Sequence, residues 1–278
     1  MLPLIVDDHI KRDDSGELRT YYDVKNKKHK WISVTALTKW AANKGAMFQQ
    51  MIDKDPTLKD KWAKRAELGT KLHKALEYNN ANNLSKYEII YYDNFQSYLN
   101  KAVISTVAKE KAILWEGTVN DLLVGFGGTG DAIHSIDYSK LYYSDGTPVN
   151  KESTISYSVI DYKTKETNKL NSHPEYGLEY YLQCAANTAA LNYRYDKAYQ
   201  ANKSLVLVST SKKLYIYYLA PKNIHYYWLA FKDMLYHYYA KTPYNWTKFE
   251  EESKLYWPSR VYLEPQSDRL INKDSLFF

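Results

Sequence analysis

The spacing of apolar positions changes near residue 110, and this change predicts how the chain is organised. Upstream, apolar residues recur every three or four positions, as they do along one face of a helix. This pattern predicts three helices, over 35–43, 55–78 and 84–109. A hairpin is expected before them, over Arg19–Val24 and Lys30–Val34.

Downstream of residue 110 the pattern is that of strands interleaved with helices. Short runs rich in β-branched and aromatic residues, bounded by glycines or polar residues, predict strands over 111–118, 122–135, 156–164, 204–209 and 214–220. Two helices are expected, over 174–193 and 222–241, and Asp145-Gly146 indicates a turn. The order βββ-α-ββ-α favours an α/β core with an N-terminal helical elaboration.

The chain is expected to form a single domain over 1–278, because no repeat, low-complexity tract or linker divides it. Within it we expect a hairpin and helical part over 1–110 and an α/β core over 111–241. A tail of weak periodicity follows over 242–278. A chain of 278 residues is long enough to bury a substantial core.

Composition narrows the possible partners and compartments. Lys and Arg exceed Asp and Glu by 38 to 32, a mild basic excess that permits a polyanionic partner. The 29 tyrosines suit both cores and wet stacking surfaces. No signal peptide and no apolar run long enough for a membrane span are seen. We therefore expect a cytoplasmic protein of a bacterium or of a phage-infected host cell, with no membrane partner.

Two acidic residues and a lysine lie at expected strand ends. Asp161-Tyr162-Lys163 closes the third expected strand, and alternation along a strand places Asp161 and Lys163 on one face. A carboxylate beside an ammonium group can hold a divalent cation and a scissile phosphate together. Asp131 follows Gly127–Gly130, and it converges with Asp161 if the two strands are neighbours. A surface ion pair and an ordinary turn aspartate are the alternatives.

Two expected helices carry further candidates. His73 can ligate a metal when neutral, and Gly69 lies one turn before it and leaves room beside the imidazole. Tyr180 and Gln183 lie on a polar stripe, from which they could hydrogen-bond a phosphate or orient a water molecule. A half-buried structural histidine and a solvated helix face are the respective alternatives.

These motifs occur in a defined order on helix, strand, strand and helix. The order is Gly69-Thr-Lys-Leu-His73, Gly127–Asp131, Asp161-Tyr-Lys163 and Tyr180-x-x-Gln183, with Ser33-Val-Thr35 and Arg65 upstream. The set resembles the RecB-like branch of the PD-(D/E)xK nuclease superfamily, and within it the mitochondrial-genome-maintenance type of exonuclease. The resemblance spans residues 30–240 and implies a restriction-endonuclease-like core, a mixed central sheet flanked by helices with the site at its strand ends.

The resemblance also implies a metal centre. Asp131 and Asp161 would bind one or two Mg²⁺ or Mn²⁺ ions together with the backbone carbonyl of Tyr162. His73 would bind or support a second ion, and Glu116 occupies the place of a further acidic ligand.

The remaining roles follow from the same resemblance. Lys163 would be the catalytic lysine, and Gln183 with Tyr180 would support the site from the helix behind it. Several relatives carry an iron–sulfur cluster on four cysteines. Cys184 is the only cysteine of the sequence, so this cluster is excluded.

DNA contacts are expected from the N-terminal helices. Lys64, Lys71 and Lys74 fall within one arc beside His73 and could follow a phosphate backbone. Tyr91 and Tyr92 belong to an aromatic stripe on which unpaired bases could stack. The alternative is that these rings pack their helix onto the core.

The motifs together with the resemblance predict a Mg²⁺- or Mn²⁺-dependent DNA exonuclease that acts on single strands or DNA ends, and the resemblance implies a 5′-phosphate product. There are two main alternatives: an endonuclease of the same fold acting on duplex or branched DNA, and a DNA-binding scaffold without activity. A weaker alternative is an aromatic-rich carbohydrate-binding module.

Gly125-Phe-Gly-Gly-Thr-Gly130 matches a dinucleotide fingerprint only formally, because a strand rather than a helix is expected after it.

Overall fold

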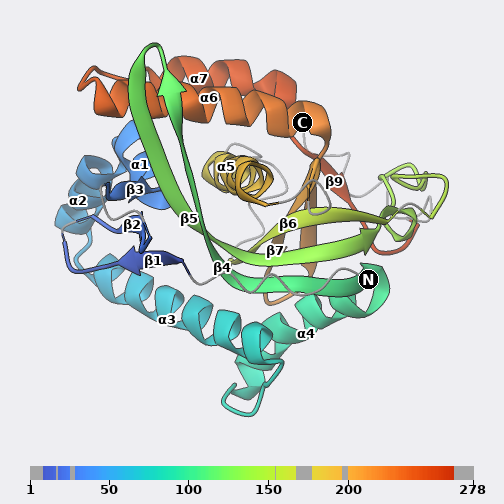
Figure 1. Cartoon of the computed structure of the whole chain (residues 1–278). Coiled ribbons are helices and arrows are strands. Elements are labelled where there is room, and N and C mark those ends of the chain that lie inside the picture. The colour runs from blue at the N-terminus through green and yellow to red at the C-terminus, as the bar shows by residue number, and fades with distance from the viewer. Residues whose placement is uncertain are drawn as a thin grey trace.

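A central mixed sheet flanked by helices forms the architecture of the computed structural model (Figure 1). The structure describes residues 9–16, 18–25, 29–153, 155–166, 177–195 and 200–265. Helices α3 and α4 cover one face of the sheet, and α5 and α6 lie on the other (Figure 1). No helix of the described residues is long and apolar enough to cross a membrane.

The strands of the described residues are β1 Ile10–Asp13, β2 Thr20–Asp23, β3 Trp31–Ser33, β4 Val103–Val119, β5 Leu122–Asp137, β6 Ile155–Thr164, β7 Lys203–Ser209, β8 Leu214–Leu219 and β9 Ser259–Val261. The helices are α1 Val34–Ala41, α2 Lys44–Lys54, α3 Thr57–Tyr78, α4 Lys86–Ala102, α5 Leu178–Arg194, α6 Pro221–Tyr239 and α7 Trp246–Ser253. The part of the chain that the structure describes also has two short 3-10 helices, η1 Tyr138–Lys140 and η5 Lys254–Tyr256.

Strand β5 holds the sheet together because three strands pair with it. Along one edge it forms a long antiparallel ladder with β4, closed by a turn at Asn120 and Asp121, which both adopt positive φ. Its other edge is shared. β3 runs parallel to it at Phe126 and Gly127, and β6 runs antiparallel to it from Ala132 onward. The order across the sheet is β1-β2-β3-β5-β6-β7-β8-β9.

Helix positions follow from local sequence. The side chain of Ser33 caps α1 by accepting from the Ala36 N–H. Ser85 and Glu88 form a capping box that starts α4. The apolar spacing that predicts the helix over 55–78 is confirmed as a buried face, since Leu72 and Leu76 of α3 are buried against the sheet.

The strand order from residue 111 is confirmed, and so are the N-terminal hairpin and the turn at Gly146. The predicted helix over 84–109 is wrong after Ala102, where Val103-Ile-Ser-Thr-Val107 begins β4, because β-branched side chains lose rotamer freedom in a helix and pack well on a sheet. α2 was not predicted. The start of the predicted 174–193 helix lies outside the described residues, as does the end of the tail, whose β9 pairs with β8.

Candidate metal centre at a gap in the sheet

The candidate site lies where β3 and β6 separate along β5. β3 ends at Ser33, opposite Gly127, and β6 leaves the ladder after Ile160, opposite Ala132. The two strands approach this gap from opposite directions, so the end of β6 has an unpaired edge beside β5 residues 128–131. Backbone and side-chain groups can converge at such a strand-end opening without disrupting a ladder.

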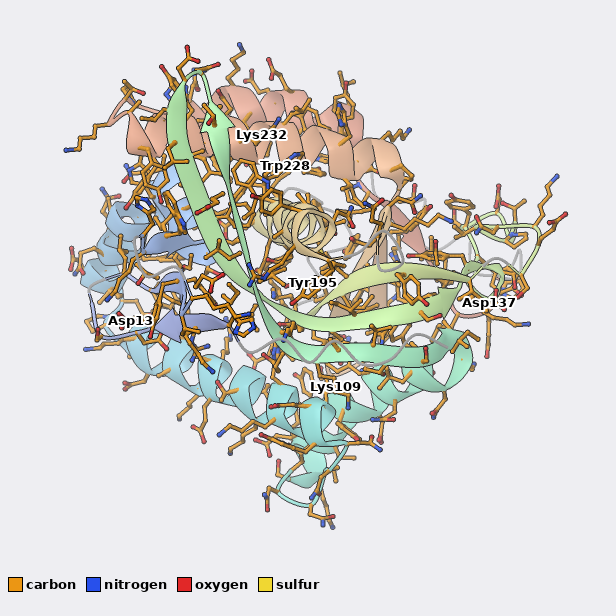
Figure 2. The ribbon with its side chains drawn as sticks, in the orientation of Figure 1. Asp13, Lys109, Asp137, Tyr195, Trp228 and Lys232 are labelled. Atoms are coloured by element: carbon orange, nitrogen blue, oxygen red, sulfur yellow. The ribbon has the colours of Figure 1, made fainter. Side chains whose placement is uncertain are left out.

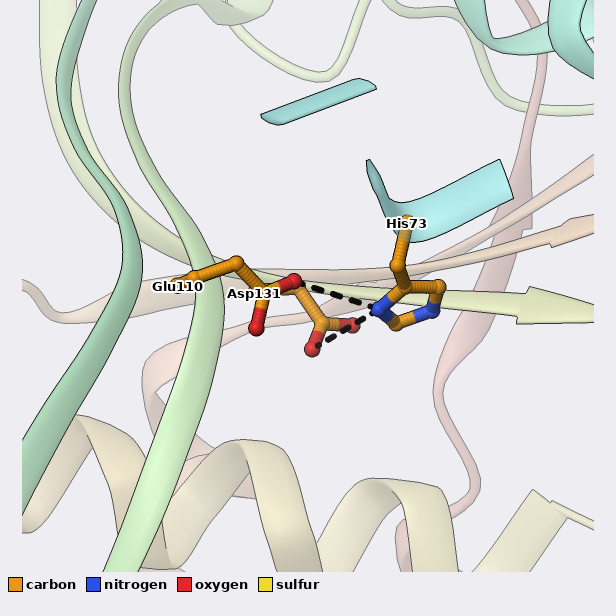
Figure 3. A group of neighbouring side chains, drawn as sticks. All are labelled: His73, Glu110 and Asp131. Carbon is orange, nitrogen blue, oxygen red and sulfur yellow. Dashed lines mark hydrogen bonds and ion pairs between the residues drawn. The ribbon is translucent and has the colours of Figure 1, made fainter. Parts of the chain in front are cut away.

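Three side chains from three elements meet at the gap (Figure 3). His73 of α3, Glu110 of β4 and Asp131 of β5 each offer a ligand atom, and these atoms lie within 4.8 Å of one another. His73 Nδ1 is 3.2 Å from Glu110 Oε1 and 3.6 Å from Asp131 Oδ1. An imidazole nitrogen facing two carboxylates is an arrangement that can hold a divalent cation.

The backbone of Tyr162 ties this cluster to β6. Its N–H donates to Asp131 Oδ2 at 2.6 Å, and its carbonyl accepts from His73 Nε2 at 3.1 Å. Its phenol lies 2.8 Å from His134 Nε2, and His134 Nδ1 lies 3.1 Å from the hydroxyl of Thr106. Since His73 Nε2 faces a carbonyl, its Nδ1 is the ring nitrogen available to an ion.

Asp161 and Lys163 flank Tyr162 and form an ion pair. Lys163 Nζ donates to Asp161 Oδ1 at 2.7 Å. The Lys163 ammonium group lies over the ring of Tyr180, 5.4 Å from its centroid. Asp161 is 2% exposed, and its Oδ2 also lies 2.7 Å from Lys163 Nζ. Both oxygens of this buried carboxylate therefore face the ammonium group, which balances their charge.

Burial and neighbouring charges shift the pKa values of the site. Burial, reinforced by the negative charge of Asp131, raises the pKa of Asp161 to about 6, although Lys163 opposes the shift. Burial would lower the pKa of Lys163, but the carboxylates of Asp161 and Asp131 outweigh it and raise this pKa. Burial would likewise lower the pKa of His73, yet Asp131 and Glu110 raise it to about 9. Without a cation, the imidazolium of His73 therefore balances the acidic cluster.

A cleft of about 650 Å³ opens onto these groups. Asp131, Lys163, Tyr180 and Gln183 line it, with Gln183 and Tyr180 reaching it from α5. Cationic side chains stand along it, namely Arg12, Arg19, Lys39 and Lys74. The cleft therefore combines an acidic centre with basic walls, a charge pattern that suits a phosphate-bearing polymer.

Sequence reasoning chose the wrong acidic residue on β4. Glu116 accepts from the indole N–H of Trp31 at 3.2 Å and pairs in register with Gly125, well along the ladder from Asp131. The acidic residue at the cluster is Glu110, which lies between Lys109, opposite Ala132, and Lys111, opposite Gly130. Glu116 is accordingly not a ligand of this centre.

The sequence pattern does not indicate Glu110 as a ligand, and the reason is physical. Its φ is 45°, a left-handed conformation that a glutamate rarely adopts. The charged run Lys109-Glu-Lys111 is typical of a solvated junction, and the helical pattern continued to residue 109. Only the acidic character of an expected strand start could have indicated it.

The expected aromatic platform for bases is wrong for Tyr91 and Tyr92. Tyr91 is 0% exposed and Tyr92 8%, and both pack with Phe95 and Tyr98 against the sheet. A base cannot reach a ring face that other side chains cover. The alternative, that these aromatics hold α4 on the core, is what the structure shows.

Only part of the basic arc expected on α3, formed by Lys64, Lys71 and Lys74, lines the cleft. Lys74 lines it, whereas Lys71 pairs with Glu67 and Glu88 at 3.0 and 3.3 Å. Lys64 is exposed on α3 and does not line the cleft. Lys71 is therefore largely neutralised, and Arg12 and Arg19 share an ion-pair partner in Asp14. Lys39 of α1 and Lys74 of α3 supply the remaining positive charge of the basic walls.

The glycines before Asp131 admit side chains rather than a ligand. A Cβ at Gly127 would lie 2.2 Å from Cβ and Cγ of Tyr21, and one at Gly128 would lie 2.2 Å from Asn187 Oδ1. At Gly69 a Cβ would meet Thr164 Oγ1 at 3.8 Å, which is ordinary contact. Gly69 lines the same cleft as His73, and its expected role, to clear space beside the imidazole, stays a prediction.

The donor set fits a hard divalent cation. Asp131, Glu110 and His73 Nδ1 supply two carboxylate groups and one imidazole, while the carboxylate of Asp161 is paired with Lys163. Carboxylate oxygens suit Mg²⁺, and a mixed oxygen and nitrogen set also suits Mn²⁺. The carbonyl of Tyr162 is occupied by His73.

Comparison with known proteins adds little to this geometry. No protein-family model and no curated protein matches the chain. Among solved structures, the crystal structure of SSO0001 is similar, with 18% identity and a TM-score of 0.39, over 76% of this chain and 78% of that chain. A likeness of this size assigns neither a fold family nor an activity to this chain.

Proposed function

We propose that this chain is a metal-dependent deoxyribonuclease that hydrolyses phosphodiester bonds at DNA ends, most readily in single strands. The observation that carries the proposal is the meeting of Asp131, Glu110 and His73 with the Asp161–Lys163 pair at one gap in the sheet, in a cleft with basic walls. The proposal includes a restriction-endonuclease-like core, in which acidic residues and a lysine gather at strand ends.

The acidic residues would hold the cation. Asp131, Glu110 and His73 lie within reach of one ion, and Asp161 on the neighbouring strand would join them by giving up part of its ion pair with Lys163. When bound, the ion would polarise a phosphate oxygen and lower the pKa of a water molecule. His73 must give up its Nδ1 proton to bind the ion, and the Tyr162 carbonyl then fixes the Nε2 tautomer.

Lys163 would act directly on the substrate. Its ammonium group is held between Asp161 and the ring of Tyr180, at the wall of the cleft. Because its pKa is raised, it stays charged at neutral pH and can neutralise the negative charge that develops on the phosphate. In the net reaction a water oxygen bonds to phosphorus and loses a proton. The P–O3′ bond breaks, and O3′ takes up a proton, which leaves a 5′-phosphate and a 3′-hydroxyl.

Gln183 and Tyr180 would position groups rather than exchange protons. Both line the cleft from α5, and burial raises the pKa of Tyr180 to about 12. Its phenol therefore keeps its proton at neutral pH and can donate a hydrogen bond. The Gln183 amide offers both a donor and an acceptor for orienting water.

Hydrolysis of end-labelled single-stranded DNA with Mg²⁺ or Mn²⁺ tests the proposal. We expect Asp161→Ala and Lys163→Ala each to lose at least about 100-fold in rate, as the removal of a stabilising group at the reacting phosphate implies. Full activity in both variants would overturn it. A circular single strand separates the two enzyme classes, because an exonuclease leaves it intact and an endonuclease does not.

A further inference from the structure

Two hollows meet at the metal centre. Besides the cleft, a cavity of about 370 Å³ lies among the end of α3, α4 and the beginning of β4. The same four residues line both spaces: His73, Glu77, Glu110 and Asp131. We call these four residues the waist, because they are the common wall between the cleft and the cavity.

The two hollows lie on opposite sides of the waist. On α3, residues between Ala66 and Lys74 line the cleft. Leu76 and Asn79, which follow His73, line only the cavity. On β5 the cleft takes Gly128 and Thr129 and the cavity takes Ala132 and His134. On both α3 and β5, the earlier residues therefore line the cleft and the later residues line the cavity. The metal centre lies between the two sets.

The wall of the cavity suits a nucleobase. Leu99, Val103 and Ile104 present apolar surface, and Ile104 is 51% exposed. Three amides, those of Asn79, Gln96 and Asn100, add donors and acceptors. A polar pocket with one apolar wall and several amide groups can take both the flat faces and the polar edges of a base, and its volume lies in the range of small-molecule sites.

The cavity is held open by bonds that do not involve a ligand. Lys109 reaches from β4 to the end of α3 (Figure 2), where Nζ donates to the carbonyls of Leu76 and Glu77 at 2.7 and 2.9 Å. The Asn79 side-chain oxygen accepts from the Tyr92 hydroxyl at 3.2 Å, which joins α3 to α4. A preformed pocket needs little ordering when it is filled.

We propose that this cavity receives the terminal nucleotide on the far side of the scissile phosphate. This inference rests on the proposed function, since a phosphate held at the waist has one nucleoside on each side of it. The cleft, with its basic walls, takes the longer strand, and the smaller cavity takes one nucleotide. The cavity therefore favours a DNA end over an internal position and binds a nucleoside monophosphate after cleavage.

Filling the cavity tests this assignment. Asn100 is exposed on α4 and lines the cavity away from the metal centre, so Asn100→Trp narrows it without touching the waist. Asn100→Ala is the matched control, and Ile104→Trp provides a second obstruction at the mouth. Each variant is assayed for release of mononucleotides from end-labelled single-stranded DNA, and for binding of dAMP with Mg²⁺ by calorimetry.

We expect Asn100→Trp to lower mononucleotide release and dAMP affinity by about tenfold or more, which corresponds to about 1.4 kcal/mol. Asn100→Ala should stay within about threefold of wild type. If wild type cleaves DNA but both Trp variants match it in rate, product length and dAMP affinity, the cavity assignment fails and the nuclease proposal stands. If wild type cleaves no DNA, the nuclease proposal fails. In that case, if wild type binds dAMP and Asn100→Trp does not, the cavity is still supported as a nucleotide-binding site. If wild type does not bind dAMP, that assignment is overturned.

Discussion

The backbone N–H of Tyr162 donates a 2.6 Å hydrogen bond to Oδ2 of Asp131, at the point where the ladder between β6 and β5 has ended. The side chain of Asp131 thus continues the pairing of two strands whose backbones have separated. Its other oxygen, Oδ1, faces His73 Nδ1 at 3.6 Å. One carboxylate therefore joins the strands through one oxygen and offers the other to an ion.

Glu110 and Glu116 provide a matched pair for testing the metal centre. Both lie on β4, but only Glu110 lies in the cluster, while Glu116 bonds to Trp31. We expect Glu110→Gln to weaken Mn²⁺ binding by about tenfold or more, because an amide is a poorer ligand than a carboxylate. Glu116→Gln should bind Mn²⁺ as wild type does. Calorimetric titration measures both, and equal affinities in the two variants would contradict the assignment.

Lys163 should stabilise the fold as well as act on substrate. The folded-state pKa of Asp161, about 6, already exceeds the ordinary value of 3.8, so its contribution to stability falls as pH rises through this interval. Lys163→Met removes the charge that opposes this rise. We expect a loss of about 3 kcal/mol in the free energy of unfolding at pH 8, as for a broken buried ion pair. The loss should shrink as pH falls from 8 towards 4.

Urea unfolding of wild type and Lys163→Met at pH 8 and pH 5 measures this difference. The double variant Lys163→Met/Asp161→Asn is the control, because it removes the unpaired charge and should regain stability at pH 8. A difference between wild type and Lys163→Met that does not depend on pH would show that the effect is one of packing alone.

His134 should make the fold sensitive to acid. Burial, with a contribution from the charge of Lys109, lowers the pKa of His134 to about 3. The unfolded chain takes up this proton near the ordinary value of 6.5 and the folded chain does not, so stability falls as pH drops from 6.5 towards 3. The slope from this one group is up to about 1.4 kcal/mol per pH unit. Unfolding of wild type and His134→Gln across this range checks it, and parallel curves would refute it.

Two glycines of β5 should respond differently to alanine. A Cβ at Gly127 would overlap the Cβ and Cγ of Tyr21, which lie next to the backbone and cannot swing away. At Gly130 a Cβ would meet Val159 Cγ1 at 3.8 Å. We expect Gly127→Ala to lose about 1–3 kcal/mol in the free energy of unfolding. Gly130→Ala should be neutral or slightly stabilising. Thermal unfolding of both variants decides, and similar losses would contradict the packing described.

The basic walls of the cleft should set the salt dependence of DNA binding. Lys39 and Lys74 line the cleft, whereas Lys248 lies on α7 beside Glu252. For each phosphate contact removed, the slope of log affinity against log salt should fall by about 0.7 for single strands. Lys39→Ala with Lys74→Ala should therefore lower the slope and the affinity, and Lys248→Ala should leave them unchanged. Fluorescence anisotropy without divalent cations measures the slopes.

The sequence predicted those features that depend on local pattern. Spacing on α3 predicted the burial of Leu72 and Leu76, and alternation along β6 placed Asp161 and Lys163 on one side, where they do pair. The order of motifs also brought Asp131 to the same gap as Tyr162. These features need only the period of an element and the identity of its neighbours.

Features set by tertiary structure were not predictable in the same way. An aromatic stripe on a helix fits a core or a binding surface equally well, and only burial of Tyr91 decides between them. The choice of Glu110 over Glu116 depends on a left-handed residue inside a long ladder, which no periodicity encodes. The division at residue 110 was also too simple, because His73 and Glu110 come from the N-terminal side of it.

Because Glu110 has a positive φ, thermal stability and catalytic activity favour different residues at this position. Glycine or asparagine would relax the backbone there, so a selection for thermostable variants should enrich such substitutions. The same substitutions would remove a carboxylate from the cluster. Variants that tolerate higher temperature through this residue are thus expected to be the poorest catalysts, a trade-off that directed evolution of the chain would encounter early.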